Sequence, residues 1–408
     1  MTASPRWKRL LGLFAALAVT AVLYPLGAGA ASGDPAAPAV AARHGQLHVC
    51  GTMLCDSAGE PVQLRGMSTH GLQWYSQCVN GDSLDALAHD WGADVVRLSM
   101  YLQEGGYETD PAGYTAMMHG LIEDASARGL YVIVDWHMLT PGDPHHNLGR
   151  AKTFFAEIAR EHGHRDNLLY EVANEPNGVT WGRIKSYHEQ IIPVIRQHDA
   201  DGVILLGTAA WSSFGLSDGM DKQQVIDDPV EASNIMYTFH FYAASHREPY
   251  LNALSRAADQ LPVFVTEFGT QDYAGEGAND FAMAQQYLDL MEDKGISWVN
   301  WNFSDDHRSG AVFETGTCSG GPYTGTTRLK EAGVWIRDRI LEGGKSSGPP
   351  AEDPSDPPVT HPAAWGPYTH YSADAHVVYE GVVYRCLQPH TALPGWEPPG
   401  APALWAAA

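Results

Sequence analysis

Two glutamates, Glu175 and Glu267, each follow a short apolar run of the kind that forms a buried β-strand. These runs span residues 168–173 and 263–265, are too short for helices, and are bounded by loop residues. Each carboxylate is therefore predicted to lie at the C-terminal end of a strand. Two carboxylates that separate strands bring to one face of a sheet can supply the acid and the nucleophile that cleave a glycosidic bond. A solvated loop residue or a salt-bridge partner is the alternative for each glutamate.

Further polar residues are predicted where neighbouring strands stop, and they could contact these carboxylates: Arg97, His137, His240 and Tyr242. Arg97 lies inside an apolar strand, where an unpaired cation would be costly. A carboxylate at the strand ends is its expected partner, and the pair would keep a nucleophile ionised. A purely structural ion pair is the alternative.

The histidines could instead be zinc ligands. The sequence has no His-Glu-x-x-His spacing, however, which favours hydrogen bonding of His137 and His240 to sugar hydroxyls and carboxylates. His70 fits the same role. No metal or organic cofactor is expected.

Tryptophans at or beyond strand ends can stack on the apolar face of a sugar ring. Trp74 follows the first predicted strand and Trp301 ends the last, so both are predicted to contact sugar. Trp136 and Trp298 lie within strands and are predicted to be part of the core.

Eight strand-like runs are predicted to position these residues. They span residues 62–67, 94–101, 131–137, 168–174, 203–207, 235–242, 262–267 and 297–303. Successive runs begin 27 to 37 residues apart, which leaves room for a helix and two loops each time. This alternation predicts an α/β fold, a (β/α)₈ TIM barrel whose C-terminal strand ends carry the chemistry. An open doubly wound sheet is the alternative, but the segment after the first strand lacks the glycine-rich dinucleotide fingerprint.

The composition limits the class of partner. The chain has 408 residues, of which 48 are acidic and 25 basic, so its formal net charge is −23. This charge would repel a phosphate backbone, so nucleic acid is excluded as a partner, while an uncharged polymer is permitted.

The N-terminal segment resembles a secretory signal. Arg6, Lys8 and Arg9 precede an apolar run at residues 10–26, and Ala28-Gly29-Ala30 forms a small-residue cleavage pattern. Residues 1–30 are therefore predicted to be a signal peptide and residues 31–46 an extension of the mature chain. An uncleaved membrane anchor is the alternative, although the run is short for a bilayer. We expect a secreted, extracellular monomer without membrane attachment.

Five cysteines fit an exported protein with disulfides. A local bridge between Cys50 and Cys55 is the favoured pairing, and Cys78 to Cys318 is a second. Cys386 is then left over.

Two composition changes divide the chain. Residues 47–342 are predicted to form the catalytic barrel, and residues 343–362, rich in Pro, Gly and Ser, a semi-stiff linker. Residues 363–408 are predicted to form a small β-rich domain with more aromatic side chains than it can easily bury. Some are expected to form its core and others a sugar-stacking platform, for which the candidates are Trp365, Tyr384 and Trp396.

Taken together, five runs resemble the endo-β-1,4-glucanase (cellulase) branch of glycoside hydrolase family 5. They are residues 65–74, 135–137, 174–178, 240–242 and 266–270. The C-terminal domain is similar to carbohydrate-binding modules of families 5 and 12, which bind cellulose or chitin. The resemblance implies that Glu175 is the acid/base, Glu267 the nucleophile and Asn174 the donor to the sugar 2-hydroxyl.

By the same resemblance, Arg97, His137, His240 and Tyr242 hold the carboxylates, while His70 and Trp301 line the subsite of the reacting sugar. The expected activity is retaining hydrolysis of internal β-1,4-glucosidic bonds in cellulose, with the carboxyl groups about 5–5.5 Å apart. Mannan, lichenan, xyloglucan or chitosan is the alternative polymer. A polysaccharide-binding protein without activity is the alternative from another class.

Overall fold

The computed structural model describes residues 40–220, 223–346, 363–366, 370–373, 375–379, 382–393 and 395–407. The predicted signal peptide and most of the predicted linker lie outside these residues. The chain divides into two compact units, residues 1–345 and 346–408, and each is described by itself.

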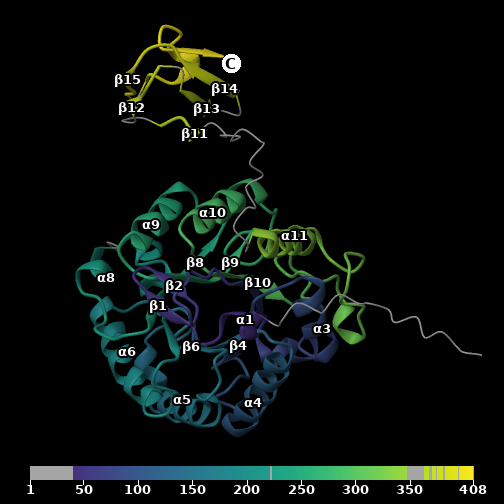
Figure 1. The fold of residues 1–408 in the computed structure, drawn as a ribbon. Helices are drawn as coiled ribbons and strands as arrows, with labels where there is room; N and C mark the ends of the chain where they lie inside the picture. Colours follow the sequence, from purple (N-terminus) through teal and green to yellow (C-terminus); the bar gives the residue numbers. More distant parts are fainter. Residues whose placement is uncertain are drawn as a thin grey trace, which may run out of the picture. The chain divides into compact units, whose positions relative to one another are not determined.

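The first unit is a closed barrel of eight parallel strands in the order β10-β3-β4-β5-β6-β7-β8-β9 (Figure 1). The strands are β3 (Arg65–Thr69), β4 (Val95–Tyr101), β5 (Tyr131–His137), β6 (Leu168–Glu171), β7 (Val203–Leu206), β8 (Ile235–Tyr242), β9 (Val263–Gly269) and β10 (Trp298–Phe303). All eight predicted strands are confirmed. The largest differences in bounds are at two strands: β3 begins three residues later than predicted, and β6 ends three residues earlier, so that Asn174 lies in the loop beyond it. The bounds of the other strands differ from the predicted ones by at most two residues.

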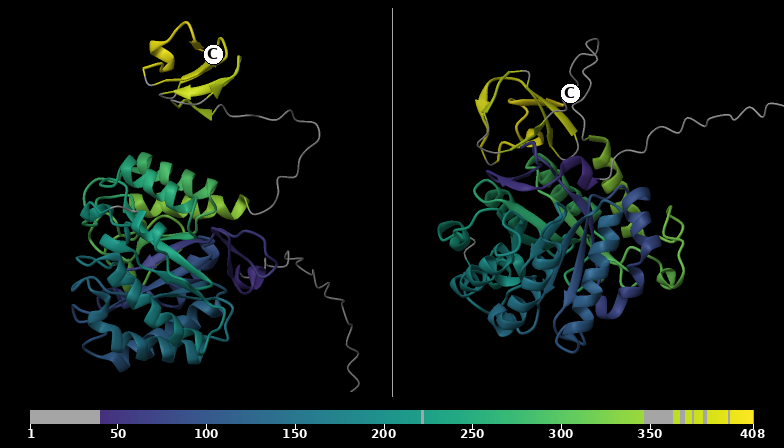
Figure 2. Two further views of the ribbon diagram at one scale, coloured as in Figure 1. Left: turned by 90° about the vertical axis from the view of Figure 1, so that its left-hand side faces the viewer. Right: turned by 60° about the horizontal axis from the view of Figure 1, so that its bottom comes forward.

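Helices surround this barrel as an outer ring (Figures 1 and 2). The long ones are α4 (Pro111–Ala127), α5 (Leu148–His162), α6 (Trp181–Arg196), α9 (Glu248–Ala258), α10 (Phe281–Asp293) and α11 (Glu331–Ser346). Shorter helical segments fill the other crossings, among them α3 (Gly81–Asp85) and α8 (Gln223–Asp227). Helix α4 shows why such a helix starts where it does: Pro111 occupies its first turn, and the Asp110 side chain accepts a hydrogen bond from Gly113 N.

One end of the barrel is closed by apolar residues. Helix α1 (Val40–His44) and the hairpin of β1 (His48–Cys50) and β2 (Met53–Cys55) lie across it (Figure 2). Leu47, Leu54 and Leu64 pack there against inward-facing strand residues such as Val95 and Phe264. This burial leaves the opposite end, where the strands finish, for polar chemistry.

Two disulfides are present in the first unit, and both predicted pairings are confirmed. Cys50–Cys55 joins the two strands of the hairpin, and Cys78–Cys318 joins the loop after β3 to the loop after β10. Cys386, which lies buried in the second unit, takes part in neither.

Removing the Cys78–Cys318 disulfide is expected to destabilise the fold more than removing Cys50–Cys55. The bonded residues are 240 positions apart in the first case and 5 in the second. A cross-link restricts the unfolded chain more as its loop lengthens. The double alanine variant of Cys78 and Cys318 should therefore lose about 5 kcal/mol of unfolding free energy, and that of Cys50 and Cys55 about 2 kcal/mol. Urea unfolding measures both values, and equal losses would contradict the expectation.

The second unit is β-rich, as predicted. A four-stranded sheet has the order β11-β13-β14-β16, and β12 (His370–Tyr371) pairs with β15 (His390–Thr391). The sheet strands are β11 (Ala363–Ala364), β13 (His376–Tyr379), β14 (Val382–Cys386) and β16 (Trp405–Ala407).

The aromatic side chains of this unit divide as expected between core and surface. Tyr371 and Trp405 are buried with Val377, Trp365 and Tyr384 are half-buried, and Trp396 is exposed. Among the described residues of the chain, no helix has the length and apolar content needed to cross a membrane.

Candidate active site

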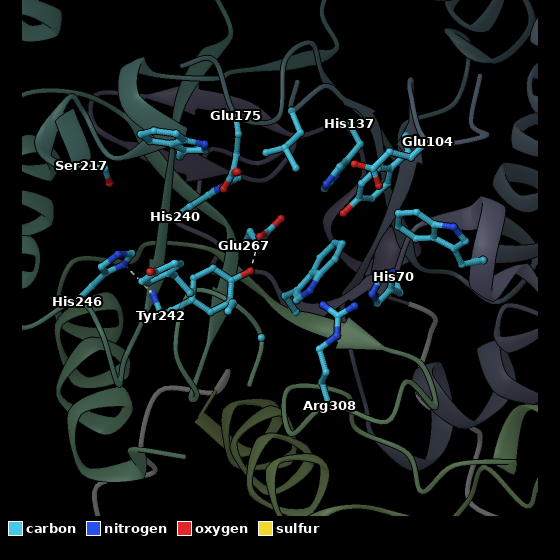
Figure 3. A pocket seen from close by; sticks show the side chains of 18 of the residues that line it. His70, Glu104, His137, Glu175, Ser217, His240, Tyr242, His246, Glu267 and Arg308 are labelled. Atoms are coloured by element: carbon cyan, nitrogen blue, oxygen red, sulfur yellow. Dashed lines mark hydrogen bonds and ion pairs between the residues drawn. The ribbon is translucent and has the colours of Figure 1, made fainter. Parts of the chain in front are cut away.

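The two glutamates predicted to do chemistry lie together at the C-terminal end of the barrel strands. Glu267 is part of β9, and Glu175 lies in the loop after β6, where its backbone N donates to Met138 O. One oxygen of each carboxylate and a ring nitrogen of His240 all lie within 4.8 Å of one another. Figure 3 shows both carboxyl groups pointing into the same pocket. The geometric prediction from the sequence is therefore confirmed.

Beneath this pair, the fully buried Arg97 contacts three carboxylates. Its guanidinium lies 3.2 Å from Glu267, 2.6 Å from Glu171 and 3.0 Å from Asp135. Burial would lower the pKa of Arg97, but the three negative charges outweigh burial and raise it. Arg97 is therefore a permanent cation, and the predicted pairing with a carboxylate at the barrel mouth is confirmed.

Each glutamate has its own partner on β8. The Tyr242 hydroxyl donates to Glu267 Oε1 at 2.5 Å, and His240 Nδ1 lies 2.9 Å from Glu175 Oε1. Figure 3 shows these two contacts on opposite sides of the gap between the carboxylates. The side chains of β8 therefore give the two glutamates different surroundings.

These surroundings separate the proton affinities of the two carboxyl groups. Burial raises the pKa of Glu175, and the nearby charge of Glu267 adds to this effect. Burial acts in the same direction on Glu267, but the positive charges of His240 and Arg97 outweigh it and lower its pKa. Neighbouring groups with diverging pKa values are the usual arrangement of an acid beside an ionised nucleophile.

A second hydrogen-bonded group orients Asn174. Its Oδ1 accepts from Arg97 at 2.6 Å, so its amide nitrogen faces the other way, 3.3 Å from His137 Nε2. His137 Nδ1 contacts Asp135 at 2.6 Å. Burial, together with the charge of Arg97, lowers the pKa of His137 well below its usual value. This histidine is therefore neutral and serves to position its neighbours.

Two sets of three side chains in the described part of the chain bring possible metal-ligating atoms together. In one set, Cys78 and Cys318 are joined in a disulfide beside Asp305. The other set is Glu175, Glu267 and His240, in which both ring nitrogens of His240 and one oxygen of each glutamate contact protein hydrogen-bond partners. Both ring nitrogens of His240 therefore take part in hydrogen bonds, as predicted.

The glutamates open into a cavity of about 680 Å³. The predicted sugar-contacting residues His70, Trp74 and Trp301 line it, and the His70 ring lies between the two indoles at 5.7 and 5.2 Å. Arg97 and Asn174 do not line it, since they are buried below the carboxylates. Trp136 and Trp298 are buried in the core, as predicted.

Sequence reasoning missed several residues of this site. Glu171 and Asp135 are fully buried partners of Arg97, and the signal for both was a charged residue inside an apolar run. Further missed residues line the cavity: Tyr101, Glu104, Trp211, Tyr273 and Arg308.

Trp211 lies in a strained segment that no sequence pattern marks. Its φ is 58°, and Ala210, Ser212 and Phe214 also have positive φ values between 51° and 56°. Such backbone is costly for residues other than glycine and is typical of functional sites. Trp211 N donates to Pro176 O, and the Ser212 hydroxyl donates to Asn174 O, so the segment is tied to the loop that carries Glu175.

The sequence profile of the cellulase family, glycosyl hydrolase family 5, matches residues 55–307. The chain belongs to this family. A second profile, carbohydrate-binding module family 5/12, matches residues 364–406, which are the β-rich second unit.

Individual members of the cellulase family are close in sequence. Endoglucanase E-5 of Thermobifida fusca is 64% identical over 299 residues, which are 73% of this chain and 64% of that protein. Endoglucanase CelA of Streptomyces lividans is 50% identical over 310 residues, 76% of this chain and 66% of that protein. The chain thus spans somewhat less than two thirds of the length of these relatives.

The barrel also matches crystal structures of the same family. The catalytic domain of Thermobifida fusca endoglucanase Cel5A has a TM-score of 0.74 and 62% sequence identity, with 74% of this chain and 100% of that chain covered. A variant of that domain in complex with cellotetraose has the same values.

Proposed function

We propose that this family 5 protein is a secreted endo-β-1,4-glucanase that hydrolyses internal bonds of cellulose with retention of configuration. The observation that carries the proposal is the pair of Glu175 and Glu267, with oxygens within 4.8 Å of each other and pKa values shifted in opposite directions. Carboxyl groups about 5–5.5 Å apart are typical of retaining enzymes, whereas inverting enzymes need about 6.5–9.5 Å to admit a water.

In the first step, an ionised oxygen of Glu267 attacks the anomeric carbon, and Glu175 donates its proton to the leaving glycosidic oxygen. The C–O bond to the leaving sugar breaks as the ester bond to Glu267 forms. Glu267 loses its charge in this step. Arg97 nevertheless remains paired, because Glu171 and Asp135 still contact it.

In the second step, Glu175, now a carboxylate, accepts a proton from a water molecule that attacks the same carbon. The ester bond breaks and Glu267 regains its charge, which Arg97 and the Tyr242 hydroxyl stabilise. The amide nitrogen of Asn174, oriented by Arg97, is the proposed donor to the sugar 2-hydroxyl.

The extent of the cavity supports cleavage within a chain. Figure 3 shows Ser217 and His246 on one side of the glutamates, and His70, Glu104 and Arg308 on the other. Two exposed indoles also line the cavity: Trp74 contacts His70, while Trp211 is tied to the loop of Glu175. Sugar units can therefore bind on both sides of the bond that is cleaved.

Hydrolysis of cellohexaose tests this proposal in one experiment. We expect shorter cellooligosaccharides from internal cleavage, released first as β-anomers, as followed by NMR. Initial release of α-anomers would contradict the mechanism, and binding without new reducing ends would indicate a polysaccharide-binding protein. Relative rates on mannan, lichenan, xyloglucan and chitosan test the choice of polymer, since a preference for any of them over cellulose would overturn it.

We also propose that the protein acts outside the cell as a monomer. The composition of residues 1–30 and the two disulfides support export. Detection of the mature chain in the culture medium, with its N-terminus sequenced, tests this part.

The second unit is proposed to hold the enzyme on insoluble cellulose through Trp396, with chitin as the alternative polymer. Trp396 is 38% exposed, whereas Trp405 is 2% exposed and part of the core. Trp396→Ala should therefore weaken adsorption to insoluble cellulose up to about 10-fold, because a stacking contact of an aromatic ring contributes about 0.5–1.5 kcal/mol and about 1.4 kcal/mol corresponds to a tenfold change in affinity. Hydrolysis of cellohexaose should be unchanged. Adsorption isotherms on cellulose and chitin measure the effect, and unchanged adsorption to both would contradict it.

A further inference from the structure

The Thr266 hydroxyl bridges two titratable groups that are buried below the pocket. Its Oγ1 lies 2.8 Å from Glu171 Oε1 and 2.9 Å from His240 Nε2. Glu171 and Thr266 are fully buried, and His240 is 2% exposed. His240 Nδ1 in turn contacts Glu175, so a continuous chain of hydrogen bonds runs from Glu171 to the acid/base residue.

The donors and acceptors in this chain can be assigned from their chemistry. An ionised carboxylate only accepts hydrogen bonds, and a hydroxyl has a single proton to donate. Two contacts to Arg97 and a pKa lowered to about 2 keep Glu171 ionised, since the charge of Arg97 outweighs the effect of burial. Thr266 therefore donates to Glu171 and must accept from His240 Nε2, which carries a proton. The other nitrogen, Nδ1, is left facing Glu175.

From this geometry we propose that Glu171 and Thr266 are positioning residues that fix the orientation and tautomer of His240, so that one proton is shared between His240 Nδ1 and Glu175. The inference rests on the proposed function, because it concerns the proton that Glu175 donates. Either Glu175 holds this proton and donates to a neutral imidazole, or Nδ1 holds it and donates to the Glu175 carboxylate. The proton leaves the pair with the departing sugar and returns from the attacking water.

The charged and titratable groups around this pair come from four other strand regions of the barrel. Arg97 lies on β4, Asp135 and His137 on β5, Glu171 on β6 and Glu267 on β9, with Tyr242 on the same strand as His240. Burial would lower the pKa of His240, but the glutamates raise it to about 9. Glu171 contributes to this directly, since its Oε1 lies 3.8 Å from His240 Nε2. The Thr266 hydroxyl lies closer and accepts the Nε2 proton, so removing this hydroxyl should lower the affinity of the His240–Glu175 pair for its shared proton.

The test compares Thr266→Val and Thr266→Ser by the pH dependence of kcat/KM for cellopentaose. The valine side chain keeps the volume but cannot accept from Nε2, so the alkaline limb should move down by about one pH unit. Thr266→Ser keeps the hydroxyl, so its alkaline pKa should equal that of the unchanged protein. Glu171→Gln removes the negative charge of the carboxylate that accepts from Thr266, and it should also lower the alkaline pKa of the kcat/KM profile.

Thr238→Val is the matched control. Thr238 is as deeply buried as Thr266 and lies on β8, but its hydroxyl contacts Leu206 O and Ser212, neither of which titrates. This variant should keep the alkaline limb of the unchanged protein. Should Thr266→Val fail to fold, Thr266→Ala tests the same loss of the hydroxyl without the branched side chain.

The outcomes separate this inference from the proposed function. If the unchanged protein cleaves cellopentaose but Thr266→Val has the same alkaline pKa in its kcat/KM profile, the inference is overturned and the proposed function is not. An equal shift in Thr238→Val would overturn it as well, because the shift would then reflect packing. An unchanged chain that releases no sugar would overturn the proposed function itself.

Discussion

Glu267→Ala is expected to reduce the rate of cellohexaose hydrolysis by about 10⁴-fold or more, since the proposed covalent intermediate forms on this carboxylate. The variant should still fold. Arg97 loses one of its three carboxylates, but Glu171 and Asp135 keep this buried cation paired. The loss of rate should therefore come from the chemistry and leave thermal stability close to that of the unchanged protein.

Azide identifies the chemical role of the missing carboxylate. With an activated aryl cellobioside, azide can occupy the space left by Glu267 and attack the anomeric carbon from the same face. The product should be the α-glycosyl azide, detected by NMR, while the aryl group leaves as the phenolate. Glu189→Ala, a change of a half-exposed glutamate on α6, is the control and should keep the full rate. A fully active Glu267→Ala variant would contradict the proposal that Glu267 is the nucleophile.

Glu175→Ala is expected to lose rate in a way that depends on the leaving group. Without a proton donor, hydrolysis of cellohexaose should fall by about 10²–10⁴-fold. Formation of the glycosyl-enzyme from 2,4-dinitrophenyl cellobioside should change little, because dinitrophenolate leaves without a proton. Burst kinetics with this substrate separate the first step from the second.

The pH profile gives a second measurement on the same variant. Because the pKa of Glu175 is raised, the carboxyl group keeps its proton to higher pH than an ordinary glutamate, and activity falls as that proton is lost. The alkaline limb of kcat/KM should therefore be absent in Glu175→Ala. Azide should now yield the β-glycosyl azide, since it attacks the intermediate in place of water. An equal loss of rate on both substrates would argue against the acid/base role.

Much of the fold and the central pair of the site follow from local sequence patterns. Apolar runs at regular intervals predict parallel strands, because each run must be buried on both faces. The C-terminal ends of parallel strands meet at one end of a barrel, so the proximity of Glu175 and Glu267 could be predicted from the sequence. Arg97 could be matched to a carboxylate for a similar reason, since an unpaired cation inside a strand is costly.

Which side chains meet inside the barrel is decided by strand register, and register is a property of the tertiary structure. The pairing of Asp135 with Glu171 across β5 and β6, and of His240 with Glu267 across β8 and β9, brings these groups to one level. A shift of one residue would turn every side chain of a strand to the other face. The three carboxylates around Arg97 could therefore not be read from the order of residues.

The eight strands, the placement of Glu175 and Glu267 at one end of the barrel and the division into a barrel and a β-rich module follow from the sequence alone, because these depend on patterns within a few neighbouring residues. Only the tertiary structure decided the Thr266 bridge between Glu171 and His240 and the position of Trp211. Contacts of this kind join residues far apart in the chain, and a loop such as the one that carries Trp211 takes its conformation from the elements that hold its ends.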